Sequence, residues 1–146
     1  MPAPTFRIRL CSWDEARPEA RRIREQVFVR EQSVPLALEM DDQDAHCDHA
    51  LAYCAEGSAV GTGRLLPDGH IGRMAVLKEW RGKGVGALLL QALVEKARQR
   101  RHVSVRLNAQ SYAAGFYRRY GFEAAGPEFI EAGIPHVAMQ RDLSCG

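Results

Sequence analysis

The pattern of apolar and polar positions predicts alternating strands and helices along nearly the whole chain. Strict alternation, as at Phe6, Ile8 and Leu10 between arginines, is typical of a half-buried strand, whereas apolar residues three and four apart are typical of a helix. These signals predict strands at 5–10, 50–55, 60–66, 74–77, 102–107, 122–130 and 135–142. They predict helices at about 14–32, 85–101 and 111–120.

The strand at 74–77 leads directly into a glycine-rich turn and then a long helix. The turn, residues 81–86, reads R-x-x-G-x-G, and Arg81 and Lys83 add positive charge to it. The helix presents an apolar face made of Val85, Leu88, Leu89, Ala92 and Leu93. Unpaired N–H groups in a first helical turn attract anions, and glycines let a phosphate approach the backbone closely. The stretch therefore predicts a phosphate-binding site.

Two common phosphate motifs do not fit this turn. It lacks the G-x-x-x-x-G-K-[ST] pattern of a nucleoside-triphosphate loop. It also lacks a G-x-G-x-x-G followed by a second strand with an acidic residue, so a dinucleotide fold is weakly supported. A glycine-rich turn without any ligand stays open as the alternative.

Composition indicates one globular domain over residues 1–146. The chain is 46% hydrophobic and 26% charged, with a net charge of +2, so the balance favours neither nucleic acid nor an anionic membrane as partner. No apolar run has the length of a membrane span, and the first residues lack a signal-peptide core, so a cytoplasmic location is expected. The four cysteines have no paired spacing and are expected to be reduced thiols: Cys11, Cys47, Cys54 and Cys145.

The segment 34–49 is acidic and has no strand or helix period, which predicts a long functional loop. Part of it offers several metal-ligand types within six residues, namely Asp44, His46, Cys47, Asp48 and His49. No second ligand pair lies at a typical spacing, so this cluster is interpreted as coincidence in a polar loop, and no metal is expected.

With its strand and helix, the R-x-x-G-x-G turn resembles the pyrophosphate-binding motif of the GCN5-related N-acetyltransferases, the GNAT family. The element order can be laid onto that fold from Phe6 to Arg141. Further blocks are similar to the ElaA-like bacterial subgroup: 27–32, the acids Glu39, Asp41 and Asp44 before His49, 107–110, 116–117, 120–122 and 133–136. The resemblance implies an α/β (α+β) fold with a mixed central sheet of about six to seven strands flanked by helices.

The resemblance also implies how acetyl-CoA is bound. The pantetheine arm would pair with the backbone as an added strand, and the pyrophosphate would be held by backbone N–H groups of the turn. The implied cofactor-binding residues are Met74, Ala75, Val76, Arg81, Gly82, Lys83, Gly84, Val85, Gly86, Asn108 and Phe116. For Asn108, capping of the following helix is an equally good interpretation from the sequence.

Acetyl transfer to an amine needs deprotonation of the amine, donors for the oxyanion and protonation of the leaving thiolate. In the family, a backbone N–H near Val76 stabilises the oxyanion. Tyr117 matches the tyrosine that serves as general acid toward the sulfur. The alternative is that Tyr117 packs in the helix core with Phe116 and Tyr120.

The general base is not identified, because the stretch 71–77 lacks the glutamate that many family members carry there. The candidates are Glu39, Asp41, Asp44, His136 and a water chain to solvent, with His136 favoured by its titration range. The acidic loop is also a candidate for attracting a cationic amine, in a pocket where these groups and His49 would meet.

Two other function classes remain open. The chain could bind acetyl-CoA without catalysis, as a sensor or interaction module. Nucleic-acid binding through Arg98, Arg100, Arg101 and Arg106 is weaker, because basic residues at a helix C-terminus follow from the dipole alone. The expected partners are acetyl-CoA and an amine acceptor, and a homodimer is left open.

Overall fold

The computed structural model describes residues 5–36 and 41–144, so Glu39 and Cys145 lie outside the described residues. The strands are β1 (Arg7–Cys11), β2 (Asp48–Tyr53), β3 (Ala59–Leu65), β4 (Ile71–Val76), β5 (Ser104–Gln110), β6 (Glu123–Ala124), β7 (Phe129–Glu131) and β8 (Ile134–Asp142). The longer helices are α1 (Trp13–Arg24), the π-helix η1 (Glu25–Glu31), α3 (Val85–Gln99) and α4 (Ala114–Arg119). Short 3₁₀ turns are η2 (Asp44–His46), η3 (Lys78–Trp80) and η4 (Ser111–Ala113).

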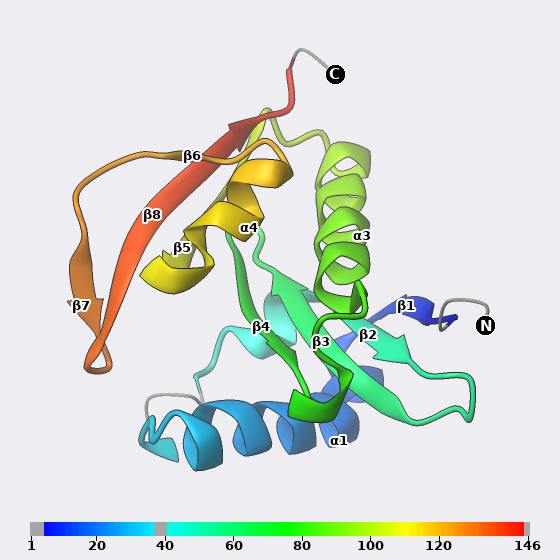
Figure 1. Ribbon diagram of the computed structural model, residues 1–146. Coiled ribbons are helices and arrows are strands. Elements are labelled where there is room, and N and C mark those ends of the chain that lie inside the picture. Colours follow the sequence, from blue (N-terminus) through cyan, green and yellow to red (C-terminus); the bar gives the residue numbers. More distant parts are fainter. Residues whose placement is uncertain (1–4, 37–40, 145–146) are drawn as a thin grey trace.

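The strands form two four-stranded sheets joined at one point, an arrangement compatible with the predicted mixed sheet of about six to seven strands (Figure 1). The first has the order β1-β2-β3-β4, and the second has β5-β8-β6 with β7 also paired to β8. The pairs within both sheets are antiparallel. A single parallel bridge between His70 and Arg106 joins the two sheets within the described residues. Beyond that bridge β4 and β5 part, and this separation creates the space for a site.

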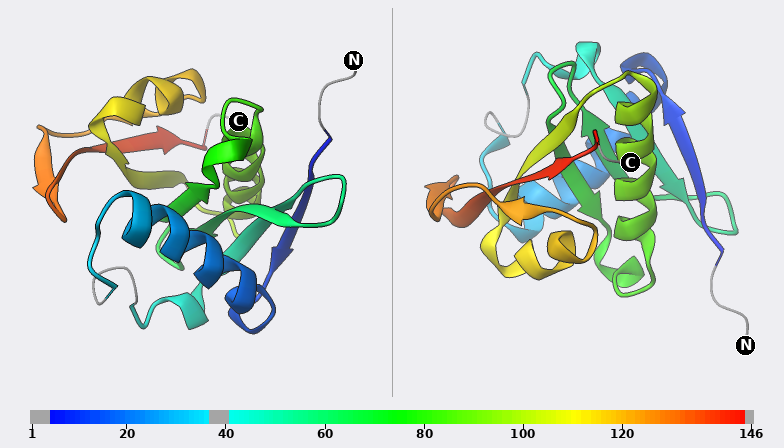
Figure 2. Two further views of the ribbon diagram at one scale, coloured as in Figure 1. Left: turned by 60° about the horizontal axis from the view of Figure 1, so that its bottom comes forward. Right: turned by 90° about the horizontal axis from the view of Figure 1, so that it is seen from above.

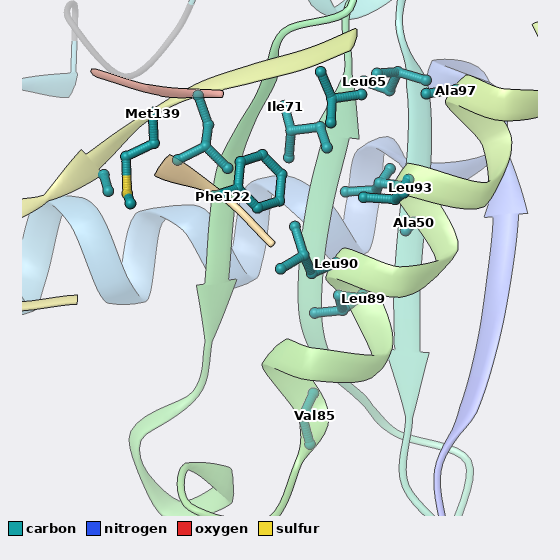
Figure 3. Packing of buried hydrophobic residues seen from close by; sticks show 14 of the residues in the cluster. Ala50, Leu65, Ile71, Val85, Leu89, Leu90, Leu93, Ala97, Phe122 and Met139 are labelled. Carbon is teal, nitrogen blue, oxygen red and sulfur yellow. The ribbon is translucent and has the colours of Figure 1, made fainter. Parts of the chain in front are cut away.

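Helix α3 packs across one face of the first sheet (Figures 1 and 3). Its buried positions are Val85, Leu89, Leu90, Leu93, Val94 and Ala97. The observed buried face is rotated slightly from the predicted one, because Leu88, which was predicted to lie on it, is 37% exposed. Two glycines on β3 allow α3 to lie close to this strand. A Cβ at Gly61 would lie 2.9 Å from the Leu89 side chain, and one at Gly63 would lie 2.9 Å from the Leu93 side chain. The close approach of helix and strand therefore depends on these two glycines.

Helix α1 covers the opposite face of the first sheet (Figure 2). Ser12 is its N-cap, and Glu15 reaches back to the Ser12 backbone in a capping box. The predicted helix to residue 32 is confirmed in extent, but its last turns form a π-helix, in which the Gln32 N–H donates to the Val27 carbonyl at 3.2 Å. Such segments are rare and occur often at functional sites.

The second sheet ends in a projecting β7–β8 hairpin (Figure 1). Ala132 and Gly133 form its two-residue turn and both have positive φ, 52° and 77°, which is the signature of a type I′ turn. The predicted strand 122–130 is interrupted, because residues 125–128 separate β6 from β7. The hairpin brings the Gly-Ile-Pro-His segment, 133–136, to the edge of the gap between the sheets.

Candidate active site

A cleft of about 760 Å³ lies where β4 and β5 part. Nine residues predicted to bind the cofactor or to catalyse line it: Met74, Ala75, Val76, Arg81, Gly86, Asn108, Phe116, Tyr117 and His136. Five predicted residues are not part of the wall: Asp41, Gly82, Lys83, Gly84 and Val85. The cleft therefore brings together two predicted sets of residues. One is the strand, turn and helix start that are predicted to bind acetyl-CoA, and the other is Tyr117 and His136, which are predicted to be catalytic.

The glycine turn ends at one side of the cleft, where helix α3 begins. Gly84 is the N-cap with φ of 89°, a conformation that favours glycine. The first hydrogen bond of the helix runs from the Leu88 N–H to the Gly84 carbonyl at 3.1 Å. The N–H groups of residues 85–87 come before it and therefore have no acceptor within the helix. Val85 is itself buried, and its contribution to an anion site would come from its backbone. This is a geometry suited to a phosphate group.

Strand β4 forms the neighbouring wall and carries a bulge. Arg73 and Met74 lie opposite the single residue Gly63 of β3. Arg73 has φ of 49°, which is uncommon for a residue with a side chain. Because β4 is the last strand of its sheet, its second edge faces the cleft and can accept an added extended chain.

Arg81 of the turn is bound to two groups beside the cleft. Its Nε donates to the Val76 carbonyl at 2.9 Å, and its Nη2 donates to Glu31 Oε1 at 2.9 Å. The arginine thus links the glycine turn both to the predicted pantetheine strand and to the end of the π-helix.

Tyr117 lies on α4, half-buried, with its ring against Phe116 and Phe122 at centroid distances of 5.1 and 6.0 Å. Burial, with a smaller contribution from Tyr112, raises the pKa of the Tyr117 phenol to about 12. The hydroxyl therefore stays protonated across the neutral range. The ring packs against the core and the residue also lines the cleft, so core packing does not decide against a catalytic role, which stays a prediction.

Asn108 is an inner residue of β5, opposite Ala138 of β8. The alternative that it caps the next helix is wrong, because the N-cap positions of η4 and α4 are Gln110 and Ala113. Two residues further along β5, Gln110 exchanges amide hydrogen bonds with Gln32 at 2.9 and 3.3 Å. This pair connects the end of the π-helix to the second sheet across the cleft.

Two carboxylates of the acidic loop, Asp41 and Asp44, bind arginines and are not part of the cleft wall. Asp44 is 3% exposed and accepts from Arg24 at 3.0 and 3.1 Å and from Arg64 at 2.9 Å. Asp41 accepts two bonds from Arg64 at 2.8 Å and one from Arg73 at 3.2 Å. For the two described carboxylates, Asp41 and Asp44, the predicted meeting at an acceptor pocket is therefore wrong.

These contacts set the charge state of both carboxyl groups. Hydrogen bonding from Arg64 is the main reason that the pKa of Asp41 falls to about 2. Burial would raise the pKa of Asp44, but hydrogen bonds and charge from Arg24 and Arg64 outweigh it and leave that pKa below its ordinary value. Carboxylates held in this way are weak bases, which does not favour Asp41 as the group that deprotonates an amine.

His136 lies on β8 at the cleft wall, only 7% exposed and stacked on Phe129. Its Nδ1 lies 2.7 Å from the Ile134 carbonyl, so Nδ1 donates the proton in the tautomer that this bond selects. Its Nε2 then carries the lone pair, 3.6 Å from Glu131 Oε2. By contrast, His49 lies outside the cleft wall, fully buried against Trp13.

Comparison with known proteins agrees with this geometry. The family model "Acetyltransferase (GNAT) domain" matches residues 14–143. The chain belongs to the GNAT family. Among curated relatives, the uncharacterized protein YyaT of Bacillus subtilis is 39% identical over 132 residues, covering 86% of this chain and 88% of the relative. The uncharacterized N-acetyltransferase YjcF of the same organism is 38% identical over 133 residues, covering 88% and 94%.

Solved structures of GNAT proteins superimpose over nearly the whole chain. A crystal structure described as a putative N-acetyltransferase from Lactobacillus plantarum has a TM-score of 0.87 at 29% identity, covering 95% of this chain and 99% of that one. Escherichia coli ElaA has a TM-score of 0.83 at 26% identity, covering 94% and 100%. The predicted family and fold are confirmed, and the protein is an acyltransferase of the N-acetyltransferase type.

Two further observations concern membrane-spanning helices and metal-binding groups. In residues 5–36 and 41–144, no helix is both long and apolar enough to cross a membrane. Within the same residues, no three His, Cys, Asp or Glu side chains are arranged to hold a metal ion. In the loop cluster, the Cys47 thiol lies 3.2 Å from the Gln43 carbonyl, and burial raises its pKa to about 11.

Sequence reasoning missed several residues of the GNAT cleft, chiefly Arg64, Arg73, Gln32 and Gln110. A signal was present for Arg64, since it is a charged residue within the otherwise apolar and small strand 59–65, and a buried charge requires a partner. No such signal in the sequence marks Gln32 and Gln110, because an amide pair across the cleft depends on how two distant segments meet in the fold.

Proposed function

We propose that the protein transfers an acetyl group from acetyl-CoA directly to a primary amine while both are bound in the cleft. The observation that carries the proposal is that one cleft contains the edge of β4, the start of α3, Tyr117 and His136. These supply a strand edge for the pantetheine arm, donors for the pyrophosphate, and an acid and a base on one cavity.

On the donor side, backbone groups of Met74, Ala75 and Val76 would bind the pantetheine arm. The N–H groups at the start of α3 would hold the pyrophosphate, with Lys83 adding charge from the turn. Asn108 and Phe116 line the same cavity and would contact the arm. A backbone N–H of β4 near Val76 would stabilise the oxyanion of the tetrahedral intermediate.

On the acceptor side, His136 would act as the base. Its Nε2 would take a proton from the amine as the new carbon–nitrogen bond forms. Glu131, whose carboxylate lies 3.6 Å from that nitrogen, would stabilise the imidazolium. The proton then passes to solvent, and the charge on the protein is restored.

As the carbon–sulfur bond breaks, the thiolate would receive a hydrogen bond from the Tyr117 phenol. Complete transfer from a phenol with a pKa of about 12 to a thiolate whose acid has a pKa of about 8.5 is uphill by ~5 kcal/mol. Tyr117 therefore stabilises the departing sulfur chiefly as a donor, and any proton that it gives up is replaced from solvent.

The test is release of free thiol from acetyl-CoA in the presence of primary amines, together with mass detection of the acetylated amine. His136→Gln should bind acetyl-CoA normally and lose at least ~100-fold in kcat at neutral pH, because the amide cannot take up a proton. Binding of acetyl-CoA without thiol release from any amine would refute catalysis and favour a non-catalytic acetyl-CoA sensor.

A further inference from the structure

Gln110 lies directly beside His136, the proposed base. The two residues are opposite each other in the antiparallel pair of β5 and β8, so their side chains leave the sheet on the same face. The Cβ atoms of directly opposite residues are about 4.5–5.5 Å apart in such pairs. Gln110 and His136 also both line the cleft. An amine that reaches Nε2 of His136 is therefore within reach of the Gln110 amide.

Asn108 lies on the same face of β5, two residues before Gln110. Successive side chains of a strand point to opposite faces, and here the intervening Ala109 is buried, so Asn108 and Gln110 point the same way. Asn108 lines the cleft and is proposed to contact the pantetheine arm. Gln110 is therefore placed where the donor half of the cleft meets the acceptor half.

A second glutamine holds the Gln110 amide from across the cleft. Gln32 Nε2 donates to Gln110 Oε1 at 3.3 Å, and Gln110 Nε2 donates to Gln32 Oε1 at 2.9 Å. Two hydrogen bonds between two planar amides fix the direction of both groups. Because an amide oxygen accepts two hydrogen bonds, Gln110 Oε1 can accept a further N–H while this pair persists.

The π-helix η1 explains how Gln32 reaches the cleft. Val27 and Gln32 both line the cleft although they are five residues apart. In an α-helix, residues five apart point about 140° away from each other, whereas the wider turn of a π-helix brings them close to one face. The hydrogen bond from the Gln32 N–H to the Val27 carbonyl, at 3.2 Å, closes this wider turn. The π-helical turn therefore points Gln32 into the cleft, where it meets Gln110.

From these observations we infer that Gln110 binds the acceptor amine through Oε1, and that Gln32 is a positioning residue for Gln110. A neutral primary amine has two N–H groups. As the carbon–nitrogen bond forms, one of these protons passes to His136 Nε2, while the other stays on the nitrogen and donates to Gln110 Oε1. The two contacts orient the nitrogen lone pair toward the thioester carbon before attack.

This role deepens the proposed acetyl transfer and rests on it, because it names the residues that select a primary amine. A secondary amine has a single N–H, which His136 takes, so it gains no hydrogen bond from Gln110. Its second carbon substituent would also occupy the place of the N–H that Gln110 binds. The polar contact therefore discriminates between the two amine classes.

The test compares primary amines with their N-methyl counterparts. Benzylamine is paired with N-methylbenzylamine, and 2-phenylethylamine with N-methyl-2-phenylethylamine, and kcat/KM is measured by thiol release from acetyl-CoA. The wild type should favour the primary member of each pair by about tenfold or more, as expected when a site makes a polar bond to a substrate group.

Variants of Gln110 connect this preference to its amide. Gln110→Met keeps the length of the side chain and removes its hydrogen bonds. It should lower kcat/KM for the primary amine about tenfold and leave the N-methyl amine and the dissociation constant of acetyl-CoA within about twofold. Gln110→Asn, whose amide is drawn back by one methylene, should lose the preference as well and decides the question if the methionine variant does not fold. Gln140→Met, at an exposed position of β8 outside the described cleft wall, is the matched control and should behave as wild type.

Variants of Gln32 test the positioning role. Gln32→Glu keeps an oxygen for the Gln110 N–H, the shorter of the two hydrogen bonds, and should keep most of the preference. Gln32→Met keeps neither bond and should lose most of it, through a fall in kcat for the primary amine with KM within about twofold, because the amine is bound but less well oriented. A loss of stability alone would lower the rates with both amines equally.

The outcomes separate the role of the glutamines from the proposed function. A preference that survives in Gln110→Met, or an equal loss of activity with both amines, would overturn amine binding by Gln110 and leave acetyl transfer standing. Equal losses in Gln32→Glu and Gln32→Met would overturn the positioning role of Gln32. Thiol release from none of the amines, with acetyl-CoA bound, would overturn both the glutamine contacts and acetyl transfer.

Discussion

Arg24 of α1 and Asp44 of η2 form a buried two-point ion pair. The two guanidinium nitrogens donate to the two carboxylate oxygens at 3.1 and 3.0 Å, and the side chains are 1% and 4% exposed. The Arg24 guanidinium also lies over the Trp13 ring, 5.4 Å from its centroid. Because Asp44 binds Arg64 as well, a single carboxylate connects α1, the acidic loop and β3.

The first prediction is that Asp44→Ala destabilises the fold by ~3–5 kcal/mol, because it leaves buried guanidinium groups without their carboxylate. Urea unfolding followed by circular dichroism measures this free energy. Asp42→Ala is the control, since Asp42 is exposed in the same loop, and it should change stability by less than about 0.5 kcal/mol. A loss below 1 kcal/mol for Asp44→Ala would show that the buried pair does not form.

This network also illustrates what the sequence could and could not predict. The strand, turn and start of α3 were predictable, because glycine positions and helix period act over a few residues. The acidic loop was predicted as a charged acceptor surface because Asp41 and Asp44 are visible in the sequence, whereas their partner Arg64 lies 20 or more residues away. Pairing over such distances is decided by sheet register and helix packing, which a local pattern does not contain.

The same limit explains the details of the fold that differ from the prediction. The π-helix at 25–31 has the same apolar spacing as an α-helix over so few residues, so the change in hydrogen bonding could not be seen. The division into two sheets depends on where β4 leaves β5, after the single bridge from His70 to Arg106. Leu88 and Leu90 are both apolar, and the sequence alone does not decide which of the two faces the core.

The second prediction concerns pH and stability. Burial is the main cause that lowers the pKa of His49, so the unfolded chain binds a proton more readily than the folded protein. The free energy of unfolding should therefore fall as the pH drops below about 6.5, by at most ~1.4 kcal/mol per pH unit for one proton. Asp41, whose pKa is lowered to about 2, adds a further loss as the pH falls from about 4 toward 2.

Denaturant titrations from pH 8 to pH 3 measure this profile. His49→Gln can keep the hydrogen bond to the Asp44 carbonyl, which His49 makes through Nε2 at 2.9 Å, but it cannot take up a proton. Its stability should therefore be nearly constant between pH 7 and pH 5. His46→Gln, at an exposed position, should show the same dependence of unfolding free energy on pH as the wild type. If His49→Gln also kept this dependence, His49 would be excluded as its source.

The third prediction tests the donor end of the cleft. Gly86→Glu should reduce acetyl-CoA affinity by at least ~100-fold, because a carboxylate at the start of α3 would compete with the pyrophosphate for the same donors. Gly86 is the better test than Gly84, which has positive φ and would be strained by any side chain. A Cβ at Gly86 would lie 3.6 Å from the Phe116 ring, an ordinary contact, so the fold should persist.

Isothermal titration calorimetry with acetyl-CoA provides the measurement. Gly126→Glu serves as control, because nothing lies within 4 Å of a Cβ there and its φ is not positive. Unchanged affinity in a folded Gly86→Glu protein would remove the glycine turn from the donor site.

The fourth prediction is that Tyr117→Phe lowers kcat about 100-fold and leaves the dissociation constant of acetyl-CoA within about twofold. The phenyl ring keeps the contacts with Phe116 and Phe122, so only the hydroxyl is lost. Tyr53→Phe, on β2 away from the cleft, controls for general effects of removing a phenol. Full activity in Tyr117→Phe would mean that solvent or another group protonates the sulfur, whereas failure to fold would assign Tyr117 to the core.

The last prediction concerns the bond between Arg81 and Glu31. A carboxylate 2.9 Å from an arginine of the glycine turn competes with an incoming pyrophosphate for that charge. Glu31→Gln should therefore raise acetyl-CoA affinity, by about two- to fivefold, since partly exposed pairs of this kind contribute under ~1 kcal/mol. The gain should shrink at high salt, where exposed charges are screened.

Glu25→Gln is the matched control for this effect. Glu25 lies on the same π-helix, is half-exposed, and is 4.0 Å from Arg30 rather than from the turn. Its substitution should leave the affinity unchanged at every salt concentration. A weaker affinity in Glu31→Gln would reverse the interpretation, because Glu31 would then be needed to hold Arg81 where acetyl-CoA binds. In that case the salt bridge between the π-helix and the turn would be part of the donor site rather than a competitor for it.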